Sequence, residues 1–502
     1  MTIPEPTADE IAATARELGY DDLADSAEEY TQMITGMLGV YEALDAIDEP
    51  EVLVSRGPVA CRRPSATEDP HHAWQVRASI TEVESGPLAG VRLAVKDSIM
   101  VAGLPMANGS DVLADFVPTG DATVVTRALR AGAEIVGKTT NEYFCMSGGS
   151  HTSHGGPVHN PHRIGVSAGG SSSGSAVVLV TGDADMALGA DQAGSIRMPA
   201  SWSGVVGLKP TYGLVPYTGI APLEGMLDHV GPMARTVTDN ARLLAVLAGP
   251  DGIDPRQRDV RIENYEAAVE AGVRGMRVGV VTEGFDSPDA EAAVTTSVRS
   301  AARSLRAAGA VVEDVSIPLH SVGPALWTAI AIEGMAETVS RNQGFAFGRD
   351  DHYPTDMMGH LFDRLDRVGG RPANVALFTM VGHYVNAKSG RLHYARAVNK
   401  TRVLRAAYDE ALSRFDVLVM PTTPQTAQPL PDPAAGPMAS MQAAIEMSAN
   451  ACPFNITHHP ALSVPCGTVD GLPVGLQIVG RHFDEPSLYR VGRAIEQHGG
   501  GR

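Results

Sequence analysis

Apolar residues near the start of the chain have the spacing of helices. They recur at steps of three and four over residues 30–44, which predicts a long helix with one apolar face. Upstream, Thr7 and Glu10 have the spacing of a capping box, so a first helix is expected to begin there. We interpret residues 1–70 as an N-terminal helical domain. It serves either as a layer packed on the main domain or as a dimerisation element.

Beyond about residue 87 the pattern changes to short buried strands separated by helices. Val91, Leu93 and Val95 alternate along the chain and predict a strand that ends near Lys96. Further strands are expected at 134–138, 278–281, 417–420, 461–464 and 474–479, with helices between them, for example at 121–131, 289–308 and 391–413. This order predicts an α/β fold over residues 71–502, in which a large mixed, mostly parallel sheet is flanked by helices on both faces.

Composition and charge exclude several classes of protein. The chain has 502 residues, 39 basic and 58 acidic, and its net charge of −19 is unfavourable for binding to nucleic acid or to anionic membranes. Its four cysteines do not form a disulfide framework. It has no apolar run of the length, about 18 residues, that predicts a membrane span, and the N-terminal residues lack the features of a signal peptide. We therefore expect a cytoplasmic protein.

The segment 165–207 is the most unusual, because it contains two clusters of glycine and serine. The first cluster, 169–175, runs directly into an apolar stretch, which argues against a flexible linker. It lacks the lysine and the glycine spacing of a phosphate-binding loop. Residues 170–174 match G-x-S-x-G with Ser172 as the nucleophile, but the residues before them do not predict the strand that this motif requires.

The second cluster, 193–195, suggests a nucleophile with its own oxyanion hole. A turn rich in small residues can direct backbone N–H groups at one point, beside the Ser195 hydroxyl. A serine hydroxyl needs a base, and no histidine–aspartate pair or S-x-x-K motif is evident. A buried lysine can act as the base if desolvation lowers its pKa. Among five lysines, Lys96 at the end of an apolar strand is the best candidate.

These segments resemble the amidase signature hydrolases over roughly residues 70–495. Four motifs of that family occur in order: KDSI at 96–99, GGSSSGS at 169–175, DQAGSIR at 191–197 and GVVGLKPTYG at 204–213. A family-like stretch at 459–477 follows. Several linked motifs in the right order form a more specific signal than one short pattern.

The resemblance implies the amidase signature fold and a Ser–Ser–Lys triad. Ser195 would be the nucleophile, Ser171 the bridging serine after a cis peptide bond at Gly170, and Lys96 the base. In this family the triad acts through an acyl-enzyme. The resemblance implies no metal, nucleotide or organic cofactor.

The resemblance also implies a site for the oxyanion and a pocket for the substrate. The oxyanion hole would consist of backbone N–H groups of Gln192, Ala193, Gly194 and Ser195. The pocket would be lined by Met146, Ser147 and Gly148. The chain departs from the family at Ala193, where glycine is usual, and the added Cβ restricts the turn if this residue needs a positive φ. The remaining pocket walls are expected from residues 300–450, where we recognise no motif.

Within the family, the motifs at 216–219 and 228–233 and the N-terminal helices resemble nitrile-pathway, enantioselective amidases. Those enzymes hydrolyse small aliphatic and aromatic carboxamides to acid and ammonia, and their N-terminal helical domain serves in dimerisation. We therefore expect a homodimer with a small-molecule amide substrate. Three alternatives remain open: a subunit of a glutamine-dependent amidotransferase that acts on misacylated tRNA, a carbamate, hydrazide or ester hydrolase with the same triad, and a non-catalytic binding protein with a decayed site.

Several conspicuous residues are interpreted as structural. Asp191 and Arg197 are expected to pair and hold the nucleophile loop. Trp327 is expected in the core or near the pocket. The adjacent histidines at 71–72 and 458–459 point in different directions, so neither pair forms a metal site by itself.

Overall fold

The chain divides into two compact units, Met1–Val52 and Leu53–Arg502. The computed structural model describes residues 3–340, 350–362, 364 and 371–498. Among the described helices, none is both long and apolar enough to cross a membrane.

The boundary between the units lies after Val52, earlier in the chain than residue 70, where the sequence analysis placed it. β1 (Val54–Ser55) pairs with β4 (Gly120–Asp121). Further along, Arg62 and Arg77 exchange two backbone hydrogen bonds, with N···O distances of 3.0 and 2.8 Å. These pairings join the residues after Val52 to the larger unit.

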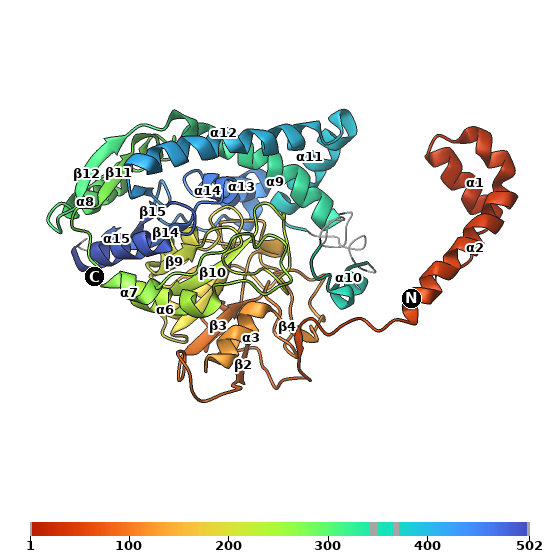
Figure 1. Ribbon diagram of the computed structural model, residues 1–502, viewed down its shortest axis with the longest axis horizontal. Coiled ribbons are helices and arrows are strands. Elements are labelled where there is room, and N and C mark those ends of the chain that lie inside the picture. The colour runs from red at the N-terminus through yellow and green to blue at the C-terminus, as the bar shows by residue number, and fades with distance from the viewer. Residues whose placement is uncertain (1–2, 341–349, 363, 365–370, 499–502) are drawn as a thin grey trace. The chain divides into compact units, whose positions relative to one another are not determined.

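The smaller unit consists of α1 (Ala8–Glu17), a 3-10 helix (Asp21–Ser26) and α2 (Ala27–Asp45) (Figure 1). The expected capping box is present. The Glu10 N–H donates to Thr7 Oγ1 at 3.3 Å, and the Thr7 N–H donates to Glu10 Oε2 at 2.8 Å. A small alanine core holds this unit together.

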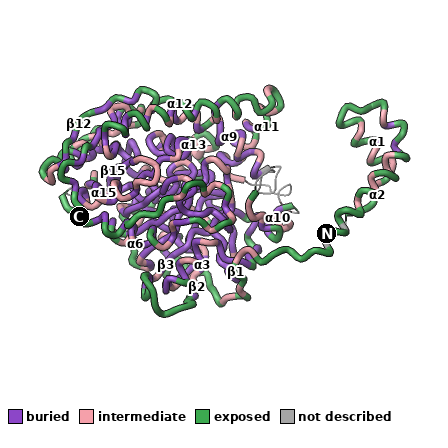
Figure 2. The backbone as a smooth tube through the Cα atoms, viewed as in Figure 1, coloured by how far each residue is buried: buried purple, intermediate pink, exposed green. Residues whose placement is uncertain are grey.

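The apolar face expected on α2 is largely exposed (Figure 2). Met33, Met37, Tyr41 and Leu44 have exposed fractions between 52% and 67%. They follow one another at steps of three and four residues, so they lie on one side of the helix. An exposed apolar face of this kind marks an interaction surface.

The larger unit is built on an 11-stranded mixed sheet, which confirms the expected fold class. In spatial order its strands are β12 (Val311–Val315), β11 (Arg277–Val281), β13 (Val417–Pro421), β15 (Leu472–Val479), β14 (Ala461–Val469), β9 (Val206–Lys209), β10 (His229–Ala234), β8 (Met186–Asp191), β3 (Arg92–Lys96), β5 (Glu134–Thr139) and β2 (Trp74–Ile80). A separate pair joins β6 (His159–Asn160) to β7 (Arg163–Ser167).

Antiparallel pairs outnumber parallel ones in this sheet, which corrects the expectation of a mostly parallel one. Among the described strands, parallel pairing is confined to β12–β11–β13 and β8–β3–β5. The strands between these groups are antiparallel, in part because β14 and β15 form a hairpin. Asp470 and Gly471 in its turn have φ values of 50° and 77°, the left-handed pair that a tight hairpin requires.

Helices cover both faces of the sheet (Figure 1). Leu93 and Val95 of β3 belong to one hydrophobic cluster, and Ala94 belongs to another, so both faces are buried. The helices are α3 (Thr123–Arg130), α4 (Ser173–Val180), α5 (Arg197–Ser203), α6 (Val237–Leu247), α7 (Tyr265–Val269), α8 (Ala292–Ser304), α9 (Gly323–Ser340), α10 (Thr355–Phe362), α11 (Ala373–Ser389), α12 (Leu392–Arg414), α13 (Gly436–Ile445), α14 (Pro453–Thr457) and α15 (Glu485–His498). Short 3-10 helices lie at Tyr143–Cys145, Thr282–Phe285, Pro318–Val322 and Pro433–Ala435.

The parallel pair β3–β8 positions the candidate site. Leu93 lies opposite Met186 and Val95 opposite Leu188, so the two strands end at the same edge of the sheet. Lys96 is the last residue of β3, and Asp191 is the last residue of β8. In α/β sheets the carboxyl ends of parallel strands are where ligands bind.

Candidate active site

Lys96 and Ser171, the expected base and bridging serine, are in direct contact. Lys96 is fully buried, and its Nζ lies 2.7 Å from Ser171 Oγ and 3.1 Å from the carbonyl oxygen of Ala190 on β8. The Gly170–Ser171 peptide bond is cis, as the family resemblance implies. Because α4 begins two residues later, the serine is held at the start of a helix.

The surroundings of Lys96 favour the neutral amine. Burial lowers its pKa and outweighs the opposing effects of Cys145 and Asp191. The two oxygen atoms hydrogen-bonded to Lys96 Nζ belong to a hydroxyl and a carbonyl group and carry no charge. The nearby buried Lys138, by contrast, has a carboxylate partner, with its Nζ 3.0 Å from Asp97 Oδ1. A neutral amine hydrogen-bonded to a hydroxyl can accept that hydroxyl's proton, which a general base must do.

Ser195 lies in the loop between β8 and α5, residues 192–196, close to Ser171. This loop is called the nucleophile loop, after the role expected of Ser195. The Ser195 carbonyl oxygen accepts a hydrogen bond from the Ser172 N–H at 3.1 Å, so the two serine segments are adjacent. The Ser172 hydroxyl donates to the Ala190 carbonyl oxygen at 3.1 Å. Ser172 therefore holds α4 to β8, which argues against it as the nucleophile of a G-x-S-x-G motif.

The loop accommodates Ala193 without backbone strain. The position with a left-handed backbone is Gly194, with a φ of 124°, whereas Ala193 has no positive φ. The Gly194 N–H donates to Asp191 Oδ1 at 2.8 Å. This donor is therefore already engaged, and the expected oxyanion hole is left with the N–H groups of Gln192, Ala193 and Ser195.

A buried ion pair fixes the nucleophile loop, as the sequence suggested. Arg197 Nη2 lies 2.9 Å from Asp191 Oδ1, and both side chains are fully buried. Asn455 adds hydrogen bonds of 2.9 Å to the same carboxylate and to the Asp191 carbonyl oxygen. Burial raises the pKa of Asp191, but Arg197 and Asn455 lower it by more, so it lies below its ordinary value. The carboxylate thus stays ionised and holds the turn.

A cavity that opens to solvent lies beside Ser195, and its empty space is about 380 Å³ when the open side is included. Its lining includes the three residues expected to bind substrate: Met146, Ser147 and Gly148. The other lining residues are Cys145, Gln192, Ala193, Met198, Trp327, Met335, Phe378, Ala444, Ile445 and Ser448. None of the described residues around this cavity is charged, which suits an uncharged, largely apolar ligand. Of the stretch expected to supply walls, 341–349, 363 and 365–370 lie outside the described residues.

Two polar contacts at the cavity have no counterpart in the sequence motifs. Trp327 on α9 donates its indole N–H to the Gln192 carbonyl oxygen at 2.8 Å. The Gln192 side chain donates its amide N–H to Tyr217 Oη at 3.0 Å. Its Oε1 atom is buried and has no hydrogen-bond partner among the described residues. An unpaired buried acceptor in a cavity wall is a potential contact for a ligand N–H.

Known proteins resemble this chain along most of its length. The family model described as Amidase matches residues 60–489. An enantioselective amidase from Rhodococcus rhodochrous is 46% identical over 434 residues, which cover 85% of this chain and 83% of that protein. A glutamyl-tRNA(Gln) amidotransferase subunit from Methanosarcina barkeri is 37% identical over 428 residues, covering 84% and 88% of the two chains.

Solved structures agree with these similarities. The corresponding glutamyl-tRNA(Gln) amidotransferase subunit from Thermotoga maritima superposes with a TM-score of 0.71 at 32% identity, covering 86% of this chain and 88% of that chain. Peptide amidase from Stenotrophomonas maltophilia superposes with a TM-score of 0.68 at 32% identity, covering 83% and 84%. The family match and the shared fold together show that this chain belongs to the amidase signature family of hydrolases.

Proposed function

We propose that this chain is an amidase that hydrolyses small aliphatic or aromatic carboxamides to carboxylic acids and ammonia. The observation that carries the proposal is the contact of 2.7 Å between buried Lys96 Nζ and Ser171 Oγ, next to the Ser195 loop and its uncharged cavity. The similarity to an enantioselective amidase supports the same reaction class.

In the proposed first step, Ser195 attacks the amide carbonyl carbon. Neutral Lys96 accepts the proton of Ser171 while Ser171 accepts the proton of Ser195. The new bond joins Ser195 Oγ to the carbonyl carbon, and the electron pair of the C=O double bond moves onto oxygen. The N–H groups left free in the nucleophile loop stabilise this oxyanion.

The intermediate then releases ammonia. The C–N bond breaks, and the proton held by Lys96 returns through Ser171 to the leaving nitrogen. An ester of Ser195 remains. Water attacks this ester with Lys96 and Ser171 again removing a proton, and the carboxylic acid leaves as Ser195 regains its hydrogen. These steps use only groups of the chain and water.

Two features of the cavity support a primary carboxamide as substrate. The unpaired Gln192 Oε1 can accept one N–H of the amide nitrogen. The apolar wall formed by side chains such as Met335, Phe378 and Ile445 can hold an aliphatic or aromatic acyl group.

The glutamine-dependent amidotransferase subunit is the second candidate, because several relatives carry that name at 36% or 37% identity. Free glutamine carries an α-ammonium and an α-carboxylate group, and buried charges need partners. The described lining of the cavity offers no charged side chain. Carbamate, hydrazide and ester hydrolysis share the acyl-enzyme step, so a substrate panel must separate them from amide hydrolysis.

We also propose that the smaller unit makes the protein a homodimer. The support is the exposed apolar face of α2, which a second copy of the same face can cover. This role matches the one that the family resemblance implies for an N-terminal helical domain.

The test is ammonia release from propionamide, benzamide, phenylacetamide and glutamine by the wild type and by Ser195→Ala. We expect release from the first three by the wild type and none by the variant. Ser173→Ala is the matched control, because Ser173 is equally buried and its hydroxyl has no described hydrogen-bond partner. Equal rates in wild type and Ser195→Ala would refute the proposed nucleophile, and release from glutamine alone would favour the amidotransferase.

A further inference from the structure

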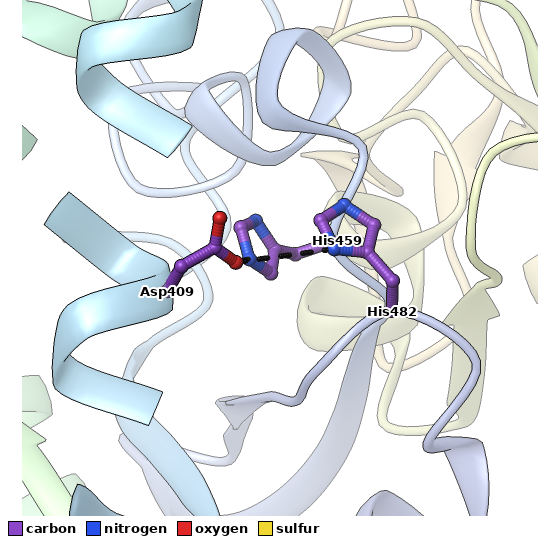
Figure 3. Close-up of side chains that lie close together, drawn as sticks. All are labelled: Asp409, His459 and His482. Atoms are coloured by element: carbon purple, nitrogen blue, oxygen red, sulfur yellow. Dashed lines mark hydrogen bonds and ion pairs between the residues drawn. The ribbon is translucent and has the colours of Figure 1, made fainter. Parts of the chain in front are cut away.

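Three side chains from distant parts of the chain converge at a point that shares no residue with the cavity (Figure 3). Asp409 lies on α12, His459 lies between α14 and β14, and His482 lies between β15 and α15. His459 Nε2 is 3.0 Å from Asp409 Oδ1, and His482 Nδ1 is 4.0 Å from the same oxygen. One donor atom from each residue lies within 4.8 Å of the other two.

We propose that Asp409, His459 and His482 bind a divalent transition-metal ion of the class of Zn²⁺. Two imidazole nitrogens and a carboxylate oxygen are ligands that such ions prefer. Ligand atoms around a tetrahedral zinc ion lie about 3.4 Å from one another, given bonds of about 2.1 Å. The distances of 3.0 and 4.0 Å fall on either side of that value. Closing the site to this geometry requires small movements of the half-exposed Asp409 side chain and of the two rings, whose donor atoms lie within 4.8 Å of each other.

Hydrogen bonds behind the histidines are compatible with the ring tautomers that a metal requires. His482 Nε2 lies 3.1 Å from the Thr457 carbonyl oxygen, so this nitrogen carries the hydrogen. Thr457 Oγ1 lies 3.1 Å from the Pro453 carbonyl oxygen and 3.1 Å from His459 Nδ1, so a hydroxyl that donates to this carbonyl can accept from the ring nitrogen. In that tautomer His459 Nε2, like His482 Nδ1, can present its lone pair to a metal ion beside Asp409, and contacts of this kind orient metal-binding histidines.

At this point the donor atoms of the two rings and the Asp409 carboxylate face one another. Arg405, one turn before Asp409 on α12, instead directs its donors to the Thr457 carbonyl oxygen and to His458 Nδ1, at 3.0 and 3.1 Å. A metal ion at this point would take one donor atom from each of the three residues.

The proposed ion would join α12 to the ends of two central strands, β14 and β15. Asp409 and His482 have side-chain exposures of 52% and 30%, which gives the ion a path from solvent and leaves a coordination position for water. Because none of the three residues lines the cavity, we assign the ion a stabilising role rather than a part in hydrolysis.

The test uses untagged, metal-free protein titrated with Co²⁺, followed by its visible absorption bands, and with Zn²⁺, followed by calorimetry. Asp409→Ala and His482→Ala remove ligands at partly exposed positions, so these variants are expected to fold. His360→Ala is the matched control. It removes a histidine whose Nε2 lies 3.2 Å from Asp115 Oδ1, and no third ligand accompanies that pair among the described residues.

We expect one ion per chain in the wild type and in His360→Ala. In Asp409→Ala and His482→Ala the affinity should fall by at least about tenfold. Zn²⁺ should raise the Tm of the wild type and of the control, but not that of the two ligand variants. Absence of binding to the wild type would overturn the proposal whatever the amidase assay shows. So would an affinity of Asp409→Ala and His482→Ala equal to that of the wild type.

Discussion

At Lys96 the requirements of catalysis and of folding oppose each other. An unfolded chain keeps a lysine protonated up to about pH 10.4, whereas burial lowers the pKa of Lys96 in the folded protein. Below that pH the folded state therefore binds fewer protons than the unfolded state. The free energy of unfolding consequently decreases as the pH falls toward the lowered pKa. The amine proposed as the base thus destabilises the fold near neutral pH.

Replacing Lys96 separates these two effects. Lys96→Met preserves the length of the side chain and should lower kcat/KM by roughly 10²–10⁴-fold, the usual contribution of a general base. It should also raise the Tm, by more at about pH 7 than at about pH 9.5, because the cost of deprotonation is larger at the lower pH. Steady-state kinetics and thermal melts at both pH values check this. Lys400→Met, at an exposed position, is the control. Near-normal rates in Lys96→Met would refute the role of Lys96 as the base.

Exchanging glycine and alanine should affect kcat/KM differently at positions 193 and 194 of the nucleophile loop. A Cβ on Gly194 would lie 2.6 Å from the Ala451 Cβ, and its φ of 124° is unfavourable for any other residue. Gly194→Ala should therefore lower kcat/KM by at least about tenfold, because strain of 1–3 kcal/mol displaces the loop. Ala193→Gly should stay within about threefold of the wild type. The opposite order in the kinetics would show that Ala193 limits the oxyanion hole.

At the level of single residues, local motifs indicated the candidate site and distant contacts did not. Lys96, Ser171 and Ser195 could be identified because each lies in a short recognisable pattern. The contacts of Asn455 and Trp327 with the nucleophile loop join residues far apart in sequence, and no local spacing records them. For the same reason, the sequence did not predict that His459 lies close to Asp409 and His482.

Helix α9 lines the cavity with Trp327 and Met335 and contacts the nucleophile loop through one hydrogen bond. The Trp327 indole holds the carbonyl of Gln192, whose N–H is a proposed oxyanion donor, so α9 positions this loop. Trp327→Phe retains most of the ring and removes the N–H donor. It should lower kcat by about three- to tenfold, as expected for one lost hydrogen bond of about 1 kcal/mol, and leave KM nearly unchanged.

The matched control for this change is Trp202→Phe. Trp202 donates its indole N–H to the Gln425 carbonyl oxygen at 3.0 Å, and not to a residue of the nucleophile loop. This variant should lose a similar hydrogen bond and show a lower Tm with an unchanged kcat. Equal effects of both substitutions on kcat would mean that Trp327 acts through general stability and not through the loop.

Elements were predictable where their information is local. The strand patterns at 461–464 and 474–479 lie within β14 and β15, and the Asp470–Gly471 dipeptide between them is typical of a hairpin turn. That dipeptide already favoured an antiparallel pair, although the sheet as a whole was expected to be mostly parallel. In the sheet, β14 pairs with β9 and β15 pairs with β13. Both partners lie well before the hairpin in the sequence, so only the folded sheet shows these pairings.

On the scale of the whole molecule, we propose that the apolar face of α2 decides the oligomeric state. Met37 and Tyr41 are exposed on that face, and burial of such side chains contributes about 25 cal/mol per Å² of apolar surface. Tyr41→Glu or Met37→Glu should convert a dimer to monomers, as measured by light scattering after size exclusion. Raised salt should strengthen the wild-type dimer, because it screens the repulsion between the two acidic units. Gln32→Glu adds the same charge at an exposed polar position of α2 and should leave the dimer intact. A monomeric wild type whose Tm falls in Tyr41→Glu would instead mean that the face packs within its own chain.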